Sequence, residues 1–110
     1  MRTLLFLFTF TSSLSFGQLI SGSLMEERRP ILDKPAYIIE GRVDGWVKYE
    51  LAVDRKGKVT SARLVETNLK DTPAKIDTKN YVKTFRFKPG SYYPKFNHVV
   101  VKITMMAGRD

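Results

Sequence analysis

The sequence has 110 residues, enough for one domain, and it contains no cysteine. Disulfide bonds, cysteine-ligated zinc and a cysteine nucleophile are therefore excluded. The formal net charge of +8 favours contact with anionic surfaces such as lipid head groups, cell-wall polymers or acidic peptide segments, although solubility is the simpler interpretation of the charge.

The first 17 residues are typical of a secretory signal peptide. Met1-Arg2 gives a positive start, residues 3–10 (TLLFLFTF) are apolar, and Ser15-Phe16-Gly17 places small residues before a cleavage site ahead of Gln18. The apolar run is shorter than the about 20 residues of a transmembrane helix, and no cysteine follows it for a lipoprotein anchor. We therefore expect export and cleavage, the alternative being an uncleaved short anchor. Arg2 would leave with the leader, so the mature chain would carry a charge of +7.

Two segments come before the first clear strand. Residues 18–34 are polar and mixed, and we expect them to form a flexible lead-in. Pro35 to Glu40 is compatible with a short helix, because Pro suits the first helical position and Gly41 would end the helix. The folded domain is therefore expected to span residues 35–110.

A strand hairpin is the strongest pattern in the chain. Residues 46–53 alternate between apolar and mixed side chains, as a half-buried strand does. Asp54-Arg55-Lys56-Gly57 then provides turn chemistry, and residues 58–66 predict the second strand. The apolar face of the first strand consists of Val47, Tyr49, Leu51 and Val53, and the other face of Trp46, Lys48, Glu50 and Ala52.

A helix and a third strand follow the hairpin. Thr72 and Pro73 resemble an N-cap and a first helical position, and they predict a helix over residues 74–85. Residues 91–97 form an aromatic loop, and residues 98–106 predict a strand with alternating apolar positions. The order β-β-α-β predicts the α+β class, a two-layer domain with the helix on one face of a three-stranded antiparallel sheet.

Residues 35–106 resemble the C-terminal domain of the TonB family. Pro35 precedes Gly45-Trp46-Val47 at the family's spacing, and Val53–Val59 fits its Val-Asp-x-x-Gly-x-Val pattern. Phe85–Pro89 fits its aromatic-Arg-aromatic-x-Pro segment, and Val99–Ile103 fits its Val-rich last strand. The chain departs from the family where Lys34 replaces the usual Tyr. It also lacks the inner-membrane helix and the Pro-rich spacer of a full energy transducer, so we interpret it as a free-standing TonB-like domain.

The resemblance implies binding by strand addition in the periplasm of a Gram-negative bacterium. An extended segment of an outer-membrane receptor would pair with the edge of the last strand, with Lys102 and Thr104 tuning the choice of partner. The alternatives are a core strand whose edge is covered, or a strand-paired homodimer. The predicted partner-binding edge is His98, Val99, Val100, Val101, Lys102, Ile103 and Thr104.

Several other side chains are candidate contacts. Arg86 could meet an acidic partner, although an Arg beside two Phe residues more often lies over their rings. Tyr92 and Tyr93, with Trp46 and Phe96, could form a contact patch, whereas packing in the core and the loop is the simpler interpretation.

The residues give little support to catalysis. His98 is the only histidine, and Asp54 is explained by the turn. Asp71 and Asp77 could be imagined as paired carboxylates, but nothing in the pattern supplies a second shell for them. We expect no enzymatic activity, no cofactor, no metal and no nucleic-acid partner.

The sequence therefore predicts a periplasmic, non-catalytic protein-interaction module linked to outer-membrane receptor transport. The alternative is a cell-envelope adaptor that binds peptidoglycan or other anionic surfaces through its positive charge. Raised salt should abolish binding by charge and should largely spare binding by strand addition.

Overall fold

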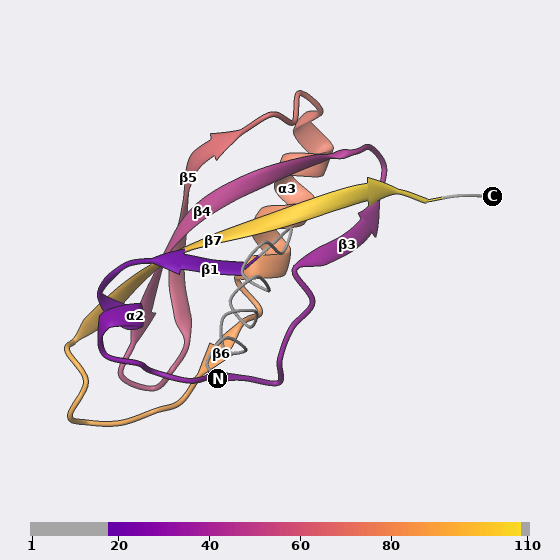
Figure 1. The fold of residues 1–110 in the computed structure, drawn as a ribbon. Helices are drawn as coiled ribbons and strands as arrows, with labels where there is room; N and C mark the ends of the chain where they lie inside the picture. Colours follow the sequence, from indigo (N-terminus) through magenta and orange to yellow (C-terminus); the bar gives the residue numbers. More distant parts are fainter. Residues whose placement is uncertain (1–17, 109–110) are drawn as a thin grey trace, which may run out of the picture.

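The computed structural model describes residues 18–108, so the predicted signal peptide lies outside the described residues. A five-stranded sheet carries one long helix, α3, on one of its faces (Figure 1). A single helical turn, α2, and a separate two-stranded sheet complete this part of the chain. The elements are β1 Gln18–Ser21, α2 Ser23–Glu26, β2 Ile31–Leu32, β3 Ile38–Gly41, β4 Gly45–Asp54, β5 Val59–Thr67, α3 Thr72–Val82, β6 Arg86–Phe87 and β7 Phe96–Ala107.

The predicted hairpin is confirmed as β4 and β5. Asp54 accepts hydrogen bonds from the backbone N–H groups of Lys56 and Lys58, both at 2.9 Å, and so closes the turn. Gly57 has a φ of 85°, which favours glycine, and a Cβ there would lie only 1.9 Å from the carbonyl oxygen of Phe87. The turn therefore requires Asp54 for its hydrogen bonds, and it requires Gly57 for its backbone conformation and its close approach to Phe87.

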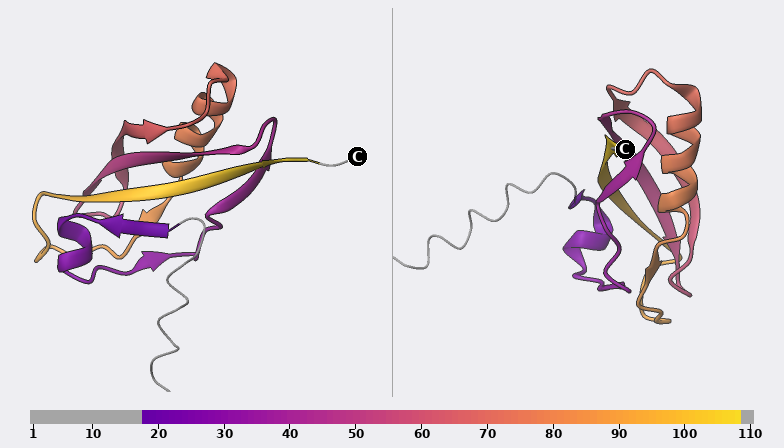
Figure 2. Two further views of the ribbon diagram at one scale, coloured as in Figure 1. Left: turned by 45° about the horizontal axis from the view of Figure 1, so that its top comes forward. Right: turned by 90° about the vertical axis from the view of Figure 1, so that its right-hand side faces the viewer.

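The predicted helix is confirmed as α3, with different ends. Its N-cap is Asp71 rather than Thr72, and the Asp71 carboxylate accepts a hydrogen bond from the N–H of Ala74 at 3.2 Å. The helix ends at Val82, three residues before the predicted end at Phe85. It buries Ala74, Thr78 and Val82 against the sheet, and the right-hand view of Figure 2 shows this layer.

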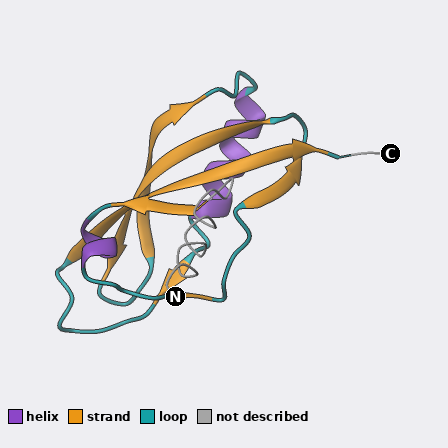
Figure 3. Cartoon of the chain, viewed as in Figure 1, coloured by secondary structure: helices purple, strands orange, loops and turns teal. Residues whose placement is uncertain are grey.

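The predicted last strand is β7, and it lies inside the sheet. The strand order is β1-β7-β4-β5, and β3 also pairs with β7 (Figures 1 and 3). The sheet therefore has five strands, not the three that we predicted, and the pairing of β3 with β7 is parallel. The helix predicted over residues 35–40 was also wrong, because Ile38 and Ile39 are β-branched and pair with Thr104 and Met105 of β7.

The N-terminal segment is folded, in contrast to the predicted flexible lead-in over residues 18–34. It forms β1, α2 and β2 in succession. The side chain of Leu24 is fully buried, and that of Arg29 is only 3% exposed. Burial of these two side chains attaches the segment to the rest of the domain.

The core lies between the sheet and α3. The apolar faces that alternation predicted for the two strands are both buried there. Within the described residues, no helix is long and apolar enough to cross a membrane. The buried strand residues are Val47, Tyr49, Leu51 and Val53 of β4 and Val99, Val101, Ile103 and Met105 of β7.

Candidate functional site

The edge of β7 that we predicted to bind a partner is covered by the chain itself. β1 pairs antiparallel with β7, with Leu19 opposite Val101. β3 pairs parallel with the next part of the strand, from Ile38 opposite Thr104 to Gly41 opposite Ala107. The prediction of a free edge over residues 98–104 was therefore wrong, because two N-terminal strands occupy the position where a partner segment would pair.

Further hydrogen bonds join the N-terminal part of the described chain to β7. The N–H of His98 donates to the hydroxyl oxygen of Ser23 at 3.0 Å, and the N–H of Thr104 donates to the carbonyl oxygen of Tyr37 at 2.9 Å. Gly22 has a φ of 121°, and a Cβ there would lie 2.2 Å from the carbonyl oxygen of His98. The turn after β1 thus approaches β7 too closely for any residue except glycine.

Arg29 holds this covering segment in place. Its Nε donates to the carbonyl oxygen of Lys88 at 2.8 Å, its Nη1 to Oδ1 of Asn97 at 3.0 Å, and its Nη2 to the carbonyl oxygen of Asp54 at 2.8 Å. The guanidinium also lies over the ring of Tyr93, 4.1 Å from its centroid. Desolvation lowers the pKa of Arg29, and nearby negative charge and tyrosines partly oppose this shift.

Sequence reasoning missed Arg29. It sits in the charged run from Glu26 to Pro30, where such side chains are normally solvated, and its partners lie 25 to 68 residues further along the chain. No local pattern marks it, since only the tertiary fold brings these oxygens together.

The outer strands of the sheet within residues 18–108 are β1, β3 and β5, and β5 is the longest of them. Within residues 18–108, β5 pairs with β4 alone, apart from a single bridge between Lys58 and Arg86 just before the strand begins. Register shifts leave Thr60 and Val65 with no directly opposite residue on β4, so β5 is bulged near both ends. The stretch of regular pairing between the bulges, residues 61–64, therefore presents outward backbone groups along one side.

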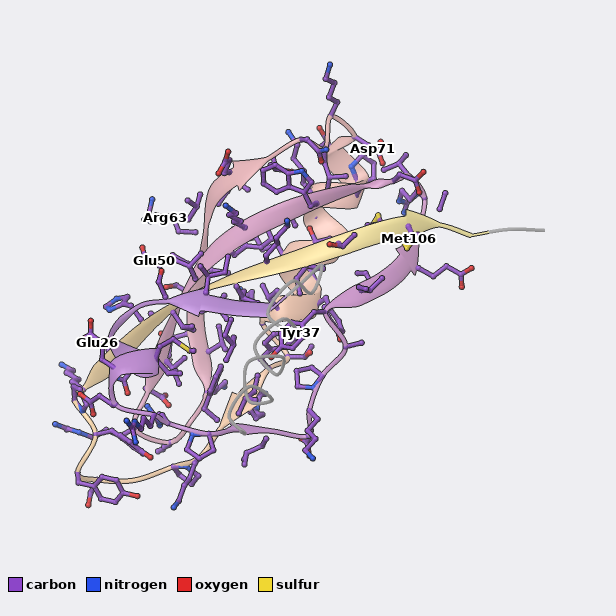
Figure 4. The ribbon with its side chains drawn as sticks, in the orientation of Figure 1. Glu26, Tyr37, Glu50, Arg63, Asp71 and Met106 are labelled. Carbon is purple, nitrogen blue, oxygen red and sulfur yellow. The ribbon has the colours of Figure 1, made fainter. Side chains whose placement is uncertain are left out.

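The side chains around this open stretch are mixed. Leu64 is 44% and Val65 is 46% exposed. Arg63 forms an ion pair with Glu50 of the neighbouring strand, and Figure 4 shows these two side chains close together. Nζ of Lys48 on β4 lies 3.4 Å from Oε1 of Glu66 on β5. An extended partner would meet both exposed aliphatic side chains and ion pairs along this edge.

The other predicted contact residues do not form one patch. Arg86 donates hydrogen bonds to the carbonyl oxygens of Lys83 and Phe85, which cap the end of α3. Tyr93 is buried beneath Arg29, while Tyr92 next to it is 70% exposed. Of the tyrosine pair, only Tyr92 is available to a partner.

Trp46 lies half-buried on the face of the sheet opposite α3. The ammonium groups of Lys48 and Lys102 lie 5.6 Å and 5.3 Å from the centroid of its ring. These two lysines are also directly opposite each other in the pairing of β4 with β7. The interpretation of Trp46 as a core residue is therefore wrong, since Trp46 lies outside the core and its ring supports two lysine side chains at the surface.

The carboxylates considered for catalysis have structural partners. Asp71 caps α3, Asp77 pairs with Arg42 at 3.1 Å, and Asp54 closes the hairpin turn. Among the described residues there is no group of three or more His, Cys, Asp or Glu side chains arranged to hold a metal ion. A surface hollow of about 820 Å³ lies at the ends of β3 and β7 and is lined by Ile38, Ile39, Glu40, Asp44, Met106, Ala107 and Gly108.

Comparison with known proteins gave no match to a protein-family model, a curated protein or a solved structure. The resemblance to the TonB C-terminal domain therefore stays a prediction from the residues that carry it.

Proposed function

We propose that this chain is a periplasmic protein-interaction module that binds an extended segment of a partner by adding it to its sheet along the edge of β5. The observation that carries the proposal is that β5, the longest outer strand of the sheet within residues 18–108, pairs with β4 alone. Backbone hydrogen bonds to an added strand would supply affinity, and the exposed side chains of Leu64 and Val65 would contact side chains of the partner.

The choice of β5 over β7 follows from what each edge already holds. A partner at β7 would have to displace β1 or β3, and the segment that carries β1 is anchored by Leu24 and Arg29. A partner at β5 has nothing to displace over residues 61–64 in the described chain. Strand addition at β5 therefore avoids the free-energy cost of unpairing part of the sheet.

The proposed partner is an extended segment of an outer-membrane receptor. This part of the proposal rests on the predicted leader and on the TonB-like motifs at Gly45–Val47, Val53–Val59 and Phe85–Pro89. The module would act without catalysis, cofactor or metal.

An NMR titration of isotope-labelled residues 18–110 tests the proposal. Synthetic peptides that copy extended segments of outer-membrane receptors would be added at low and at moderate salt. We expect salt-resistant shift changes centred on residues 61–66. Changes centred on residues 98–104 would move the binding site to β7, and an absence of saturable shifts with every peptide would contradict strand addition.

A further inference from the structure

The end of the molecule opposite the N-terminus of α3 carries a basic hollow. It lies where the β4–β5 turn meets the loop between β6 and β7, and both segments lie at the lower left in Figure 1. The hollow has a volume of about 330 Å³ and is open to solvent. Its lining residues are Asp54, Arg55, Lys56, Thr60, Lys95 and Phe96.

Hydrogen bonds fix the two segments relative to each other. The N–H of Gly90 donates to the carbonyl oxygen of Arg55 at 2.9 Å, and Nε of Arg55 donates to the carbonyl oxygen of Tyr93 at 2.9 Å. Arg29, buried beneath the loop, holds Lys88 and Asn97 on either side of it. The cations around the hollow therefore project from a pre-organised backbone, which lowers the entropic cost of binding.

The positive charge of the hollow exceeds the negative charge beside it. Arg55, Lys56 and Lys95 are exposed, and within residues 18–108 none of them forms an ion pair with a carboxylate. Asp54 is the only acidic residue in the lining, and its Oδ1 already accepts two backbone N–H groups of the turn. Glu27 interacts electrostatically with Arg29 and Tyr93, and it does not line the hollow.

Aromatic side chains accompany these cations. Phe96 lines the hollow and is 43% exposed, with the ammonium group of Lys95 5.9 Å from its ring centroid. Tyr92, in the same loop, is 70% exposed. Cations attract anionic lipid head groups, and aromatic rings settle at head-group depth, so this combination fits a membrane surface better than an acidic peptide.

We propose that this end of the molecule docks on a membrane surface through the phosphate groups of anionic lipids. Arg55, Lys56 and Lys95 contact the phosphates, and Phe96 enters the head-group layer. The proposal is independent of strand addition, because the turn and the loop lie outside the open stretch of β5 at residues 61–64.

Flotation of residues 18–110 with lipid vesicles tests the docking surface. We expect binding to vesicles of phosphatidylglycerol and phosphatidylethanolamine, and little binding to vesicles of phosphatidylcholine. The triple variant Arg55→Gln/Lys56→Gln/Lys95→Gln should weaken binding about 100-fold. The matched control Lys70→Gln/Lys79→Gln/Lys83→Gln removes the same charge from exposed positions around α3 and should weaken binding far less.

A second variant separates loss of charge from loss of structure, because the Arg55 side chain also donates a hydrogen bond to the carbonyl oxygen of Tyr93 in the loop. Lys56→Gln/Lys95→Gln keeps that bond and should weaken binding about 30-fold. Equal losses in the site variant and the control triple would overturn the proposal, as would equal binding to phosphatidylcholine. NMR titrations with inorganic phosphate and with polyglutamate complete the test. Saturation by either one at the hollow, without vesicle binding, would overturn the membrane assignment.

Discussion

The strand predicted to offer a free edge, β7, and the outer strand β5 are protected in different ways. The edge of β7 is covered by β1 and β3, two strands from the N-terminal part of the chain. The edge of β5 has no such cover in the described residues, and only its bulges at Thr60 and Val65 and its charges limit unwanted pairing. A strand that resembles a binding edge by its sequence can therefore be internal, while a less regular strand remains open.

The cover on β7 is part of the fold and not a loosely attached strap. Leu24 is fully buried, and Arg29 bonds to three oxygens on other parts of the chain. Uncovering β7 would expose Leu24 to water and would leave those oxygens without their buried donor. Substitutions at each edge separately test this difference.

The largest expected effect comes from Arg29→Met. The substitution keeps much of the side-chain volume and removes every donor, so the free energy of unfolding should fall by about 3 kcal/mol. Urea denaturation followed by circular dichroism would measure it. The exposed neighbour is the control, and Arg28→Gln should change the stability by less than about 0.5 kcal/mol. If Arg29→Met were as mild as the control, the N-terminal cover would not be anchored as described.

A smaller effect is expected from placing a charge on the open edge. Leu64→Lys puts a lysine on β5, where it opposes the approach of another strand, and peptide affinity should fall about tenfold. Ile38→Lys is the matched control, since Ile38 on β3 is also 44% exposed and lies beside the covered edge. Isothermal titration with the same peptide would compare the two variants. A loss that is greater for Ile38→Lys would place the partner on the other side of the sheet.

The smallest effect concerns Tyr49, which pairs with Leu64 of β5 and whose hydroxyl donates to the carbonyl oxygen of Lys75 at 2.7 Å. Tyr49→Phe should cost about 1 kcal/mol at neutral pH. Burial raises the pKa of Tyr49 above its ordinary value of 10.0, with a hydrogen bond to Thr78 acting against the shift. The neutral phenol is therefore favoured by folding.

The sign of the pH dependence follows from this shift. The stabilisation is present in full below the pKa of the unfolded chain, near pH 10, and is lost as pH rises through the higher pKa of the folded state. Urea denaturation at a series of alkaline pH values should show a shallower decline for Tyr49→Phe than for the wild type. Tyr37, whose pKa is also raised by burial, should sustain the remaining slope. Parallel declines would show that Tyr49 ionises equally well in the folded and unfolded states.

Local chemistry explains which elements could be predicted. The hairpin is written in the alternation of residues 46–53 and in Asp54 and Gly57 of the turn. The helix follows from Pro73 and a capping side chain, although Asp71 rather than Thr72 performs the capping. In each of these cases the deciding contacts lie within a few residues along the chain.

Long-range pairing explains what could not be predicted. Residues 18–21 and 38–41 are too short to show a strand pattern, and they become strands because β7 offers them an edge. Arg29 could not be predicted either, because its charge favours an exposed position, whereas bonds to distant parts of the chain hold it buried. The sequence could not place a candidate site on β5 for the same reason, since only the assembled sheet shows which strands are outer ones.

Hydrogen exchange in the free protein, followed amide by amide, is the most direct test of the difference between the edges. We expect the amides of residues 98–106 on β7 to exchange only through global unfolding, because β4 pairs on one side and β1 and β3 on the other. Alternate amides of residues 61–66 on β5 should exchange much faster. Equally fast exchange along β7 would show that its cover opens readily, and would contradict the assignment of β5 as the open edge.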